Sequence, residues 1–151
     1  MAKRIEPSRK SPADRLQDLL LGHAEAAGSG PASAVKYLER TLGSSGSLPN
    51  AVKFFAYALL VEAASGVKTP ESEETALAAL ADAEHYLPVA QEEIPREWQT
   101  RREQLKFLEV GIALRSDRAE FDEALRLCDL ALALGYGSAF SSKRNSILRM
   151  T

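Results

Sequence analysis

Apolar residues recur along this chain at the three-to-four-residue spacing of amphipathic helices. No segment alternates for long with the period of two that is typical of a strand. Glycines and prolines separate the apolar segments, as expected where one helix ends and the next begins. The predicted fold class is therefore all-α, with helices over residues 12–27, 31–42, 50–65, 70–87, 95–115, 118–134 and 138–149.

Prolines and polar capping residues mark where these helices begin. Five of the seven prolines stand at a predicted helix start, where the missing N–H would have no helical partner: Pro12, Pro31, Pro49, Pro70 and Pro95. Ser11 and Thr69 are favourable N-caps. Asp117 with Glu120 has the spacing of a capping box and predicts the start of the sixth helix. Ser138 is the expected cap of the last helix.

The second, fourth and sixth predicted helices share one spacing of small and bulky residues. A small residue is followed four positions later by a bulkier one, and three positions later by another small one. Small residues let a neighbouring helix approach closely, while the bulkier residue fills the space between them. The three sets are Ala34, Leu38 and Thr41; Ala76, Leu80 and Ala83; and Ala124, Cys128 and Ala131.

This spacing resembles the second helix of a tetratricopeptide repeat. Gly22, preceded by Leu21, stands 12 residues before Ala34, at the Leu–Gly position of that family, and Pro88 stands 12 residues after Ala76, at its terminal proline. Other positions depart from the family pattern. Gly46 and Tyr136 replace the terminal proline in the first and third units, Thr41 replaces an alanine, and Trp98 does not align with the family's tryptophan.

The resemblance covers about residues 12–136 and implies a stack of helical hairpins. It predicts about three antiparallel hairpins, over residues 12–42, 50–87 and 95–134, in a right-handed tetratricopeptide-like solenoid. The helix at 138–149 would cap the open end of the stack, with Phe140, Ile147 and Leu148 packed inward. Residues 1–11 are expected to form a flexible tail. An ordinary helical bundle with other connections is the alternative.

Composition and charge narrow the classes of function. The hydrophobic fraction is 45% and the formal net charge is −2, which gives no general attraction to nucleic acid or to anionic membranes. No stretch reaches the length of about 18 apolar residues that a spanning helix needs. The single cysteine, Cys128, fits a reducing compartment. We therefore expect a cytoplasmic protein with no nucleic-acid partner and no membrane insertion.

No motif for catalysis or metal binding stands out. His23 and His85 lie in different units and lack the companion ligands of a metal site. Cys128 occupies a bulky core position, where burial makes a thiol inert. Gly28 and Gly30 form a turn between helices rather than a phosphate loop, because no strand precedes them. The sequence therefore predicts a non-catalytic protein without cofactor or metal.

The segment from Glu71 to Glu93 is acidic and contains no lysine or arginine. One interpretation is an ordinary solvated helix face. The other is an acidic surface that favours a basic peptide, or the basic end of a second copy of the chain.

Tetratricopeptide-like stacks use an inner groove, lined by the first helix of each hairpin, to hold a peptide or helix. The resemblance therefore implies a protein-interaction module, an adaptor or chaperone-like scaffold whose partner is another protein or peptide. Two alternatives are a structural, self-associating subunit that forms a homo-oligomer, and a small ligand-binding helical bundle. The candidate groove residues are Leu19, His23, Lys53, Tyr57, Arg102, Lys106 and Glu109.

Overall fold

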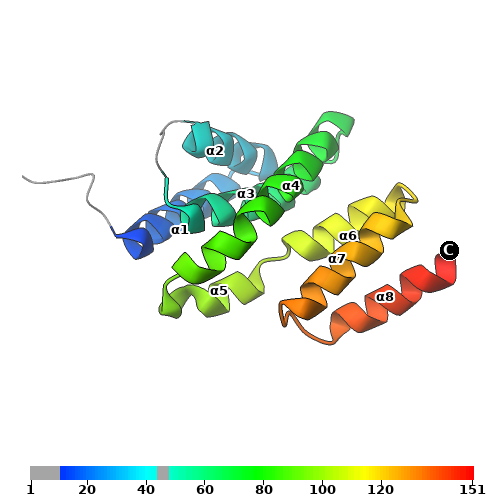
Figure 1. Ribbon diagram of the computed structural model, residues 1–151. Helices are drawn as coiled ribbons and strands as arrows, with labels where there is room; N and C mark the ends of the chain where they lie inside the picture. Colours follow the sequence, from blue (N-terminus) through cyan, green and yellow to red (C-terminus); the bar gives the residue numbers. More distant parts are fainter. Residues whose placement is uncertain (1–10, 44–47) are drawn as a thin grey trace, which may run out of the picture.

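The computed structural model describes residues 11–43 and 48–151, apart from the side chains of residues 103 and 104. The predictions for the tail before Ser11 and for Gly46 lie outside the described residues. Every regular element within them is helical, in agreement with the predicted all-α class (Figure 1). The elements are α1 (Pro12–Ala27), α2 (Pro31–Gly43), α3 (Asn50–Val67), α4 (Pro70–Glu93), the 3₁₀ turn η1 (Arg96–Trp98), α5 (Gln99–Gln104), α6 (Phe107–Asp117), α7 (Phe121–Ala133) and α8 (Ala139–Met150).

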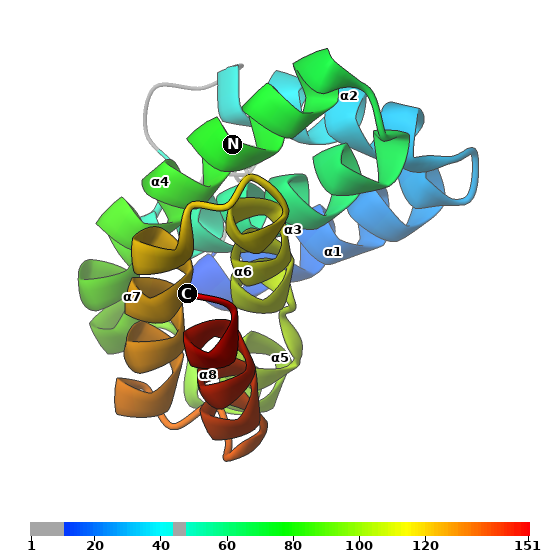
Figure 2. The same ribbon diagram turned by 90° about the vertical axis from the view of Figure 1, so that its right-hand side faces the viewer.

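Most helices pack against the next helix in the chain. The adjacent pairs are α1 with α2, α2 with α3, α3 with α4, α6 with α7, and α7 with α8. Three further contacts join helices that are not consecutive, α1 with α3, α3 with α6, and α4 with α6. Figures 1 and 2 show the result, with α1 and α2 at one end of the molecule and α8 at the other.

Helix α3 is the centre of the core because its sequence is apolar on nearly every side. Phe54 and Phe55 are consecutive, and both are fully buried. The ring of Phe54 meets the ring of Phe107 on α6 edge to face, with centroids 5.5 Å apart. Full burial of a phenylalanine contributes about 1.5–3 kcal/mol. The three-sided packing of α3 against α2, α4 and α6 thus follows from its composition.

The small residues of the repeated spacing are buried, as predicted. Ala34, Ala76, Ala83, Ala124 and Ala131 are at most 1% exposed, as are the three bulky residues between them. The exception, Thr41, is half-buried, and its hydroxyl donates to the carbonyl of Tyr37 at 2.9 Å. Gly111 on α6 adds a close contact of the same kind, since a Cβ there would lie 2.8 Å from Leu80 Cδ2.

The predicted helix starts at Ser11 and Thr69 are confirmed, and the one at Asp117 is wrong. The Ser11 hydroxyl accepts the N–H of Asp14 at 3.1 Å, and Thr69 forms a reciprocal capping box with Ser72. Asp117 instead ends α6, and α7 begins only at Phe121, without a side-chain cap. Glu120 does not cap a helix because its carboxylate accepts from Arg115 Nη1 at 2.7 Å.

Pro88 does not end the second unit, contrary to the prediction. Helix α4 continues through it to Glu93. Proline cannot donate the helical hydrogen bond to the carbonyl four residues earlier. However, Leu87 and Ala90 on either side are 2% and 0% exposed, and their packing keeps the chain helical.

The predicted helix over residues 95–115 is interrupted. It consists of η1, α5 and α6, and the chain is extended at Leu105, with φ −67° and ψ 138°. The break frees the N–H of Lys106, which donates to Glu62 Oε2 on α3 at 2.9 Å. Helix α5 is therefore separated from α6 by a short non-helical link (Figure 1).

Helix α8 packs against α7 at the C-terminal end. Phe140 and Ile147 are 5% and 3% exposed, as predicted for a capping helix. The predicted inward packing of Leu148 is wrong, because this side chain is 43% exposed. Leu148 follows Ile147 directly, so it points roughly 100° away from the buried face of the helix. Arg144 Nε also holds α8 to α7 through Asp129 Oδ1 at 2.7 Å.

Candidate partner-binding groove

Two cavities lie between α1 and the η1–α5 segment, and Arg101 lines both of them. The outer cavity has a volume of about 360 Å³ and is lined by Ala13, Asp14, Gln17, Glu97, Trp98 and Arg101. The inner cavity has a volume of about 150 Å³ and is lined by Leu20, Phe55, Leu59, Glu62, Arg101 and Leu105. We call the two together the α1–α5 groove.

Helical spacing forms one wall of the α1–α5 groove, because residues 13, 17 and 20 lie on one face of α1. The other wall is formed by residues 97 and 98 of η1, residue 101 of α5 and the extended residue 105. The floor is α3, through Phe55, Leu59 and Glu62. Four of the six residues that line the inner cavity are apolar, whereas four of the six that line the outer cavity are polar or charged.

Trp98 anchors the η1–α5 wall to the floor. Its ring lies edge-on to Phe55, with centroids 6.4 Å apart and an interplanar angle of 73°. The guanidinium of Arg101 lies over the Trp98 ring, 5.2 Å from its centroid. The charge of Arg101 is therefore directed towards an aromatic face, a contact worth about 0.5–1 kcal/mol at an exposed site.

Glu62 is the polar group of the inner cavity. It is half-buried on an otherwise apolar stretch of α3, and its Oε2 accepts the backbone N–H of Lys106. Burial raises the pKa of the Glu62 carboxyl, and the negative charge of Glu109 adds to this effect. The N–H and the positive charge of Lys106 act in the opposite direction but do not cancel it. The site thus holds a carboxylate that lacks full compensation for its lost hydration.

Acidic groups outnumber basic groups along the α1–α5 groove. Asp14 and Glu97 line the outer cavity and Glu62 the inner one, against Arg101 alone. In the described ranges, neither Asp14 nor Glu97 forms an ion pair. The groove is therefore suited to a positively charged occupant.

The predicted site residues on α1 and around the start of α6 lie in or near this region. Leu19 is 2% exposed and belongs to the core, next to Leu20 of the groove. His23 is half-buried, and burial lowers the pKa of its imidazole. Lys106 and Glu109 are exposed on the other side of Glu62, and their charges act on it.

The structure does not bring Lys53 and Tyr57 to the groove. Tyr57 stacks on Tyr86 of α4, with centroids 5.8 Å apart and planes 9° apart. Lys53 Nζ lies 5.2 Å from the centre of the same ring. Lys53 and Phe55 are two residues apart, hence roughly 200° apart around a helix. Both predicted residues consequently lie on the side of α3 opposite to the groove floor.

Arg102 also turns away from the groove. Its guanidinium lies over the ring of Tyr136, 5.5 Å from the centroid, in the turn between α7 and α8. Its Nε and Nη1 atoms are buried there and have no hydrogen-bond partner among the described residues. Arg102 thus contacts the turn between α7 and α8 and does not line the α1–α5 groove.

Sequence reasoning missed the residues that shape the groove, namely Glu62, Trp98, Arg101 and Leu105. The sequence contains a signal that could have identified one of them. Glu62 is the only charged residue between Lys53 and Lys68, in the most apolar helix of the chain. No glycine or proline marks the break at Leu105, so the position of α5 could not be predicted from breaker residues.

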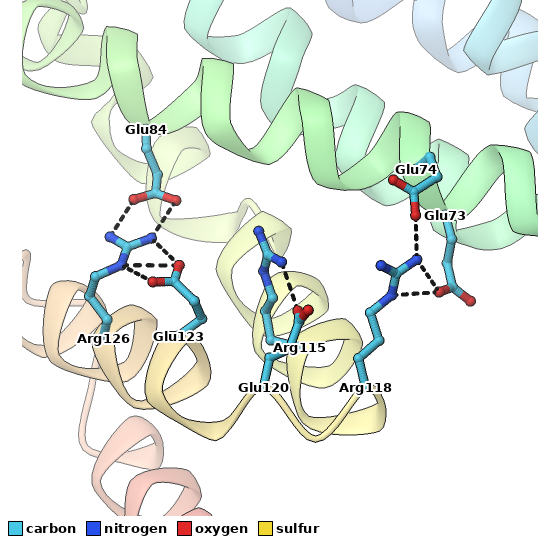
Figure 3. Close-up of polar contacts among 8 residues, drawn as sticks. All are labelled: Glu73, Glu74, Glu84, Arg115, Arg118, Glu120, Glu123 and Arg126. Carbon is cyan, nitrogen blue, oxygen red and sulfur yellow. Dashed lines mark hydrogen bonds and ion pairs between the residues drawn. The ribbon is translucent and has the colours of Figure 1, made fainter.

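Three of the seven carboxylates in the acidic segment of α4 form ion pairs with described residues of the α6–α7 hairpin (Figure 3). Arg118 binds Glu73 and Glu74 at 3.1 and 2.7 Å. Arg126 binds Glu84 of α4 at 2.7 Å and Glu123 of its own helix at 3.0 Å. These carboxylates raise the pKa of Arg126, and Arg126 lowers the pKa of Glu123. The acidic side chains Glu73, Glu74 and Glu84 therefore hold α4 to the next hairpin.

Two other features bear on chemistry. Among the residues that the structure describes, no group of three or more His, Cys, Asp or Glu side chains is placed to hold a metal ion. Cys128 is fully buried, as predicted, and burial raises the pKa of its thiol.

No helix in the described ranges is both long and apolar enough to cross a membrane.

Comparisons of the chain with protein-family models, curated proteins and solved structures find no match. The resemblance to tetratricopeptide repeats thus depends on the spacing of this chain's own residues, above all Gly22, Ala34, Ala76 and Ala124.

Proposed function

We propose that the chain is a non-catalytic protein-interaction module whose α1–α5 groove binds a peptide or helix of a partner protein. One observation supports this proposal most strongly. Two facing helical walls leave adjoining cavities over an apolar floor, with charged side chains at the rim. Apolar cavities with a few polar groups are the usual form of a binding site.

The dimensions suit a short segment of a partner. From Ala13 to Leu20, the groove wall on α1 spans seven residues, or roughly 10 Å. That is the length of about two helical turns or of three extended residues. A single side chain can enter the inner cavity while its neighbours lie along the outer one.

The proposed architecture is a degenerate tetratricopeptide-like stack. In this scheme α1, α3 and α6 are the first helices of three hairpins, and α2, α4 and α7 are the second helices. The contacts of α1 with α3 and of α3 with α6 support it, because first helices of successive repeats pack together in such a stack. The inserted α5 would then narrow the groove that the first helices form.

Site-specific photocross-linking tests the proposal. A photoreactive benzoyl-phenylalanine is placed at Gln17, which is exposed and lines the outer cavity, or at Asn145, which is exposed on α8. Each full-length variant is irradiated in extract of the native cells, and adducts are identified by mass spectrometry. Circular dichroism confirms that both variants keep the helical fold.

We expect a reproducible protein adduct from position 17 and none from position 145. If both positions capture the same proteins, or if only position 145 reacts, the groove is not the binding surface. Cross-linking of two copies of this chain through position 17 would instead support the self-associating alternative.

A further inference from the structure

The inner cavity has the chemistry of a pocket for one long side chain. Its volume of about 150 Å³ matches that of engineered apolar cavities that accept benzene. Four apolar side chains line it, from Leu20, Phe55, Leu59 and Leu105, together with the Glu62 carboxylate and Arg101. The guanidinium of Arg101 lies over the Trp98 ring, which leaves Glu62 as the acceptor in the cavity. A side chain that fills it should therefore combine an apolar stem with a cationic end, as lysine and arginine do.

We propose that a lysine or arginine side chain of the partner segment anchors it in the α1–α5 groove, with its stem in the inner cavity and its charged head on the Glu62 carboxylate. This inference rests on the proposed function and names the chemistry of the occupant. It requires that the Glu62 carboxylate can accept further hydrogen bonds.

Glu62 has that capacity. A carboxylate accepts about four hydrogen bonds, and Glu62 receives one, from the N–H of Lys106 to Oε2. The nearby cations do not occupy it, because in the described part of the chain neither Arg101 nor Lys106 forms an ion pair with Glu62. The guanidinium of Arg101 lies on Trp98 instead, and Lys106 is exposed.

The outer cavity also favours a positively charged partner segment. Asp14 and Glu97 face it from opposite walls, and both are exposed. They attract a cationic segment as it approaches, which raises the association rate more than the final affinity. The half-buried Glu62 is the position at which a lost charge should change the dissociation rate.

Peptide pools provide the test. Five pools of immobilised 11-residue peptides carry lysine, arginine, norleucine, acetyl-lysine or glutamate at the central position, and all other positions are randomised. Norleucine keeps the length of the lysine stem without its charge. The probes are the full-length chain and its variants Glu62→Gln and Glu92→Gln.

The two variants are matched. Glu62→Gln removes the charge but keeps a side-chain oxygen that can accept the N–H of Lys106. Glu92 is an exposed carboxylate of α4 that lines neither cavity and does not act on Glu62, so Glu92→Gln removes the same charge outside the groove.

We expect the lysine and arginine pools to retain the chain and the other three pools to retain it at least about tenfold less. Glu62→Gln should abolish this preference, and Glu92→Gln should leave it. Equal retention by the lysine and norleucine pools, or a preference that survives Glu62→Gln, overturns the cationic anchor but leaves the groove as a binding site. Retention by none of the pools overturns the anchor and the proposed function together.

Discussion

Gly22 on α1 lies directly against the ring of Tyr37 on α2. A Cβ on Gly22 would overlap Tyr37 Oη and Cζ, so no side chain fits there unless the tyrosine moves. The Tyr37 hydroxyl donates to the carbonyl of Asp18 at 3.5 Å, one turn before Gly22. The contact between α1 and α2 therefore requires a residue without a side chain at position 22.

Replacing Gly22 with alanine should destabilise the chain. The higher helix propensity of alanine contributes about 1 kcal/mol of stability, but overpacking costs about 1–3 kcal/mol. We expect a net loss of about 1 kcal/mol in the free energy of unfolding, measured by urea denaturation. The double variant Gly22→Ala with Tyr37→Ala should show a smaller loss than the two single losses combined.

Gly43→Ala is the matched control, since Gly43 also lies in a helix and no atom of a described residue stands within 4 Å of its would-be Cβ. It should be neutral or slightly stabilising. If Gly22→Ala behaves like Gly43→Ala, α1 and α2 do not approach as closely as described.

The alanines of α4 supply a second prediction. Ala83→Leu and Ala76→Leu place a larger side chain at positions that are fully buried, and each should cost about 1–3 kcal/mol. Ala78→Leu and Ala81→Leu make the same change on the exposed face of the same helix and should alter stability by less than about 0.5 kcal/mol. Thermal denaturation of the four variants measures the difference. Equal effects on the two faces would contradict the small-residue contacts.

The ion pairs of Arg126 should make a small but measurable contribution to the free energy of unfolding. It binds Glu84 on α4 and Glu123 on α7, and its side chain is 49% exposed. Because exposed ion pairs are screened by water and salt, Arg126→Ala should cost only about 0.5–1 kcal/mol, and the loss should shrink in about 1 M salt. Arg40→Ala on α2 is the control, since that exposed arginine forms no ion pair in the described ranges. If Arg126→Ala lowers the free energy of unfolding no more than Arg40→Ala does, the ion pairs of Arg126 do not stabilise the fold.

Glu62 should make stability depend on pH. Its folded-state pKa lies above its ordinary value of 4.5, so the fold favours the protonated carboxyl. This contribution is complete at pH values below the unfolded pKa and is lost as the pH rises through the folded pKa. Glu62→Gln cannot ionise, and its unfolding free energy relative to the parent chain should therefore increase from about pH 4 to about pH 7. Urea denaturation across this range, with Glu92→Gln as reference, checks the sign. A constant difference would mean that Glu62 is not desolvated.

Much of the helical pattern could be predicted from the sequence because local signals agree with packing. The buried alanines of α2, α4 and α7 follow from spacing alone, and the caps at Ser11 and Thr69 follow from residue type. Where local signals and packing disagree, packing decides. Pro88 is a strong breaker, yet the burial of Leu87 and Ala90 carries α4 past it.

The groove was harder to predict because it depends on the direction of α5. That direction is set by long-range contacts, such as Trp98 with Phe55 and the Lys106 N–H with Glu62, which no local pattern reveals. The resemblance places residues 53 and 57 in the groove by their helix, and that helix does form the floor, but it presents a different face. A residue's element can thus be inferred from sequence more readily than the neighbour it faces.

Amide hydrogen exchange on the full-length chain, alone and with the partner captured through position 17, tests the central claim most directly. If the partner lies in the α1–α5 groove, exchange should slow in residues 97–106 and in the first two turns of α1, and remain unchanged in α8. Slower exchange confined to α7 and α8, or no change in residues 97–106, would contradict a partner-binding groove between α1 and α5.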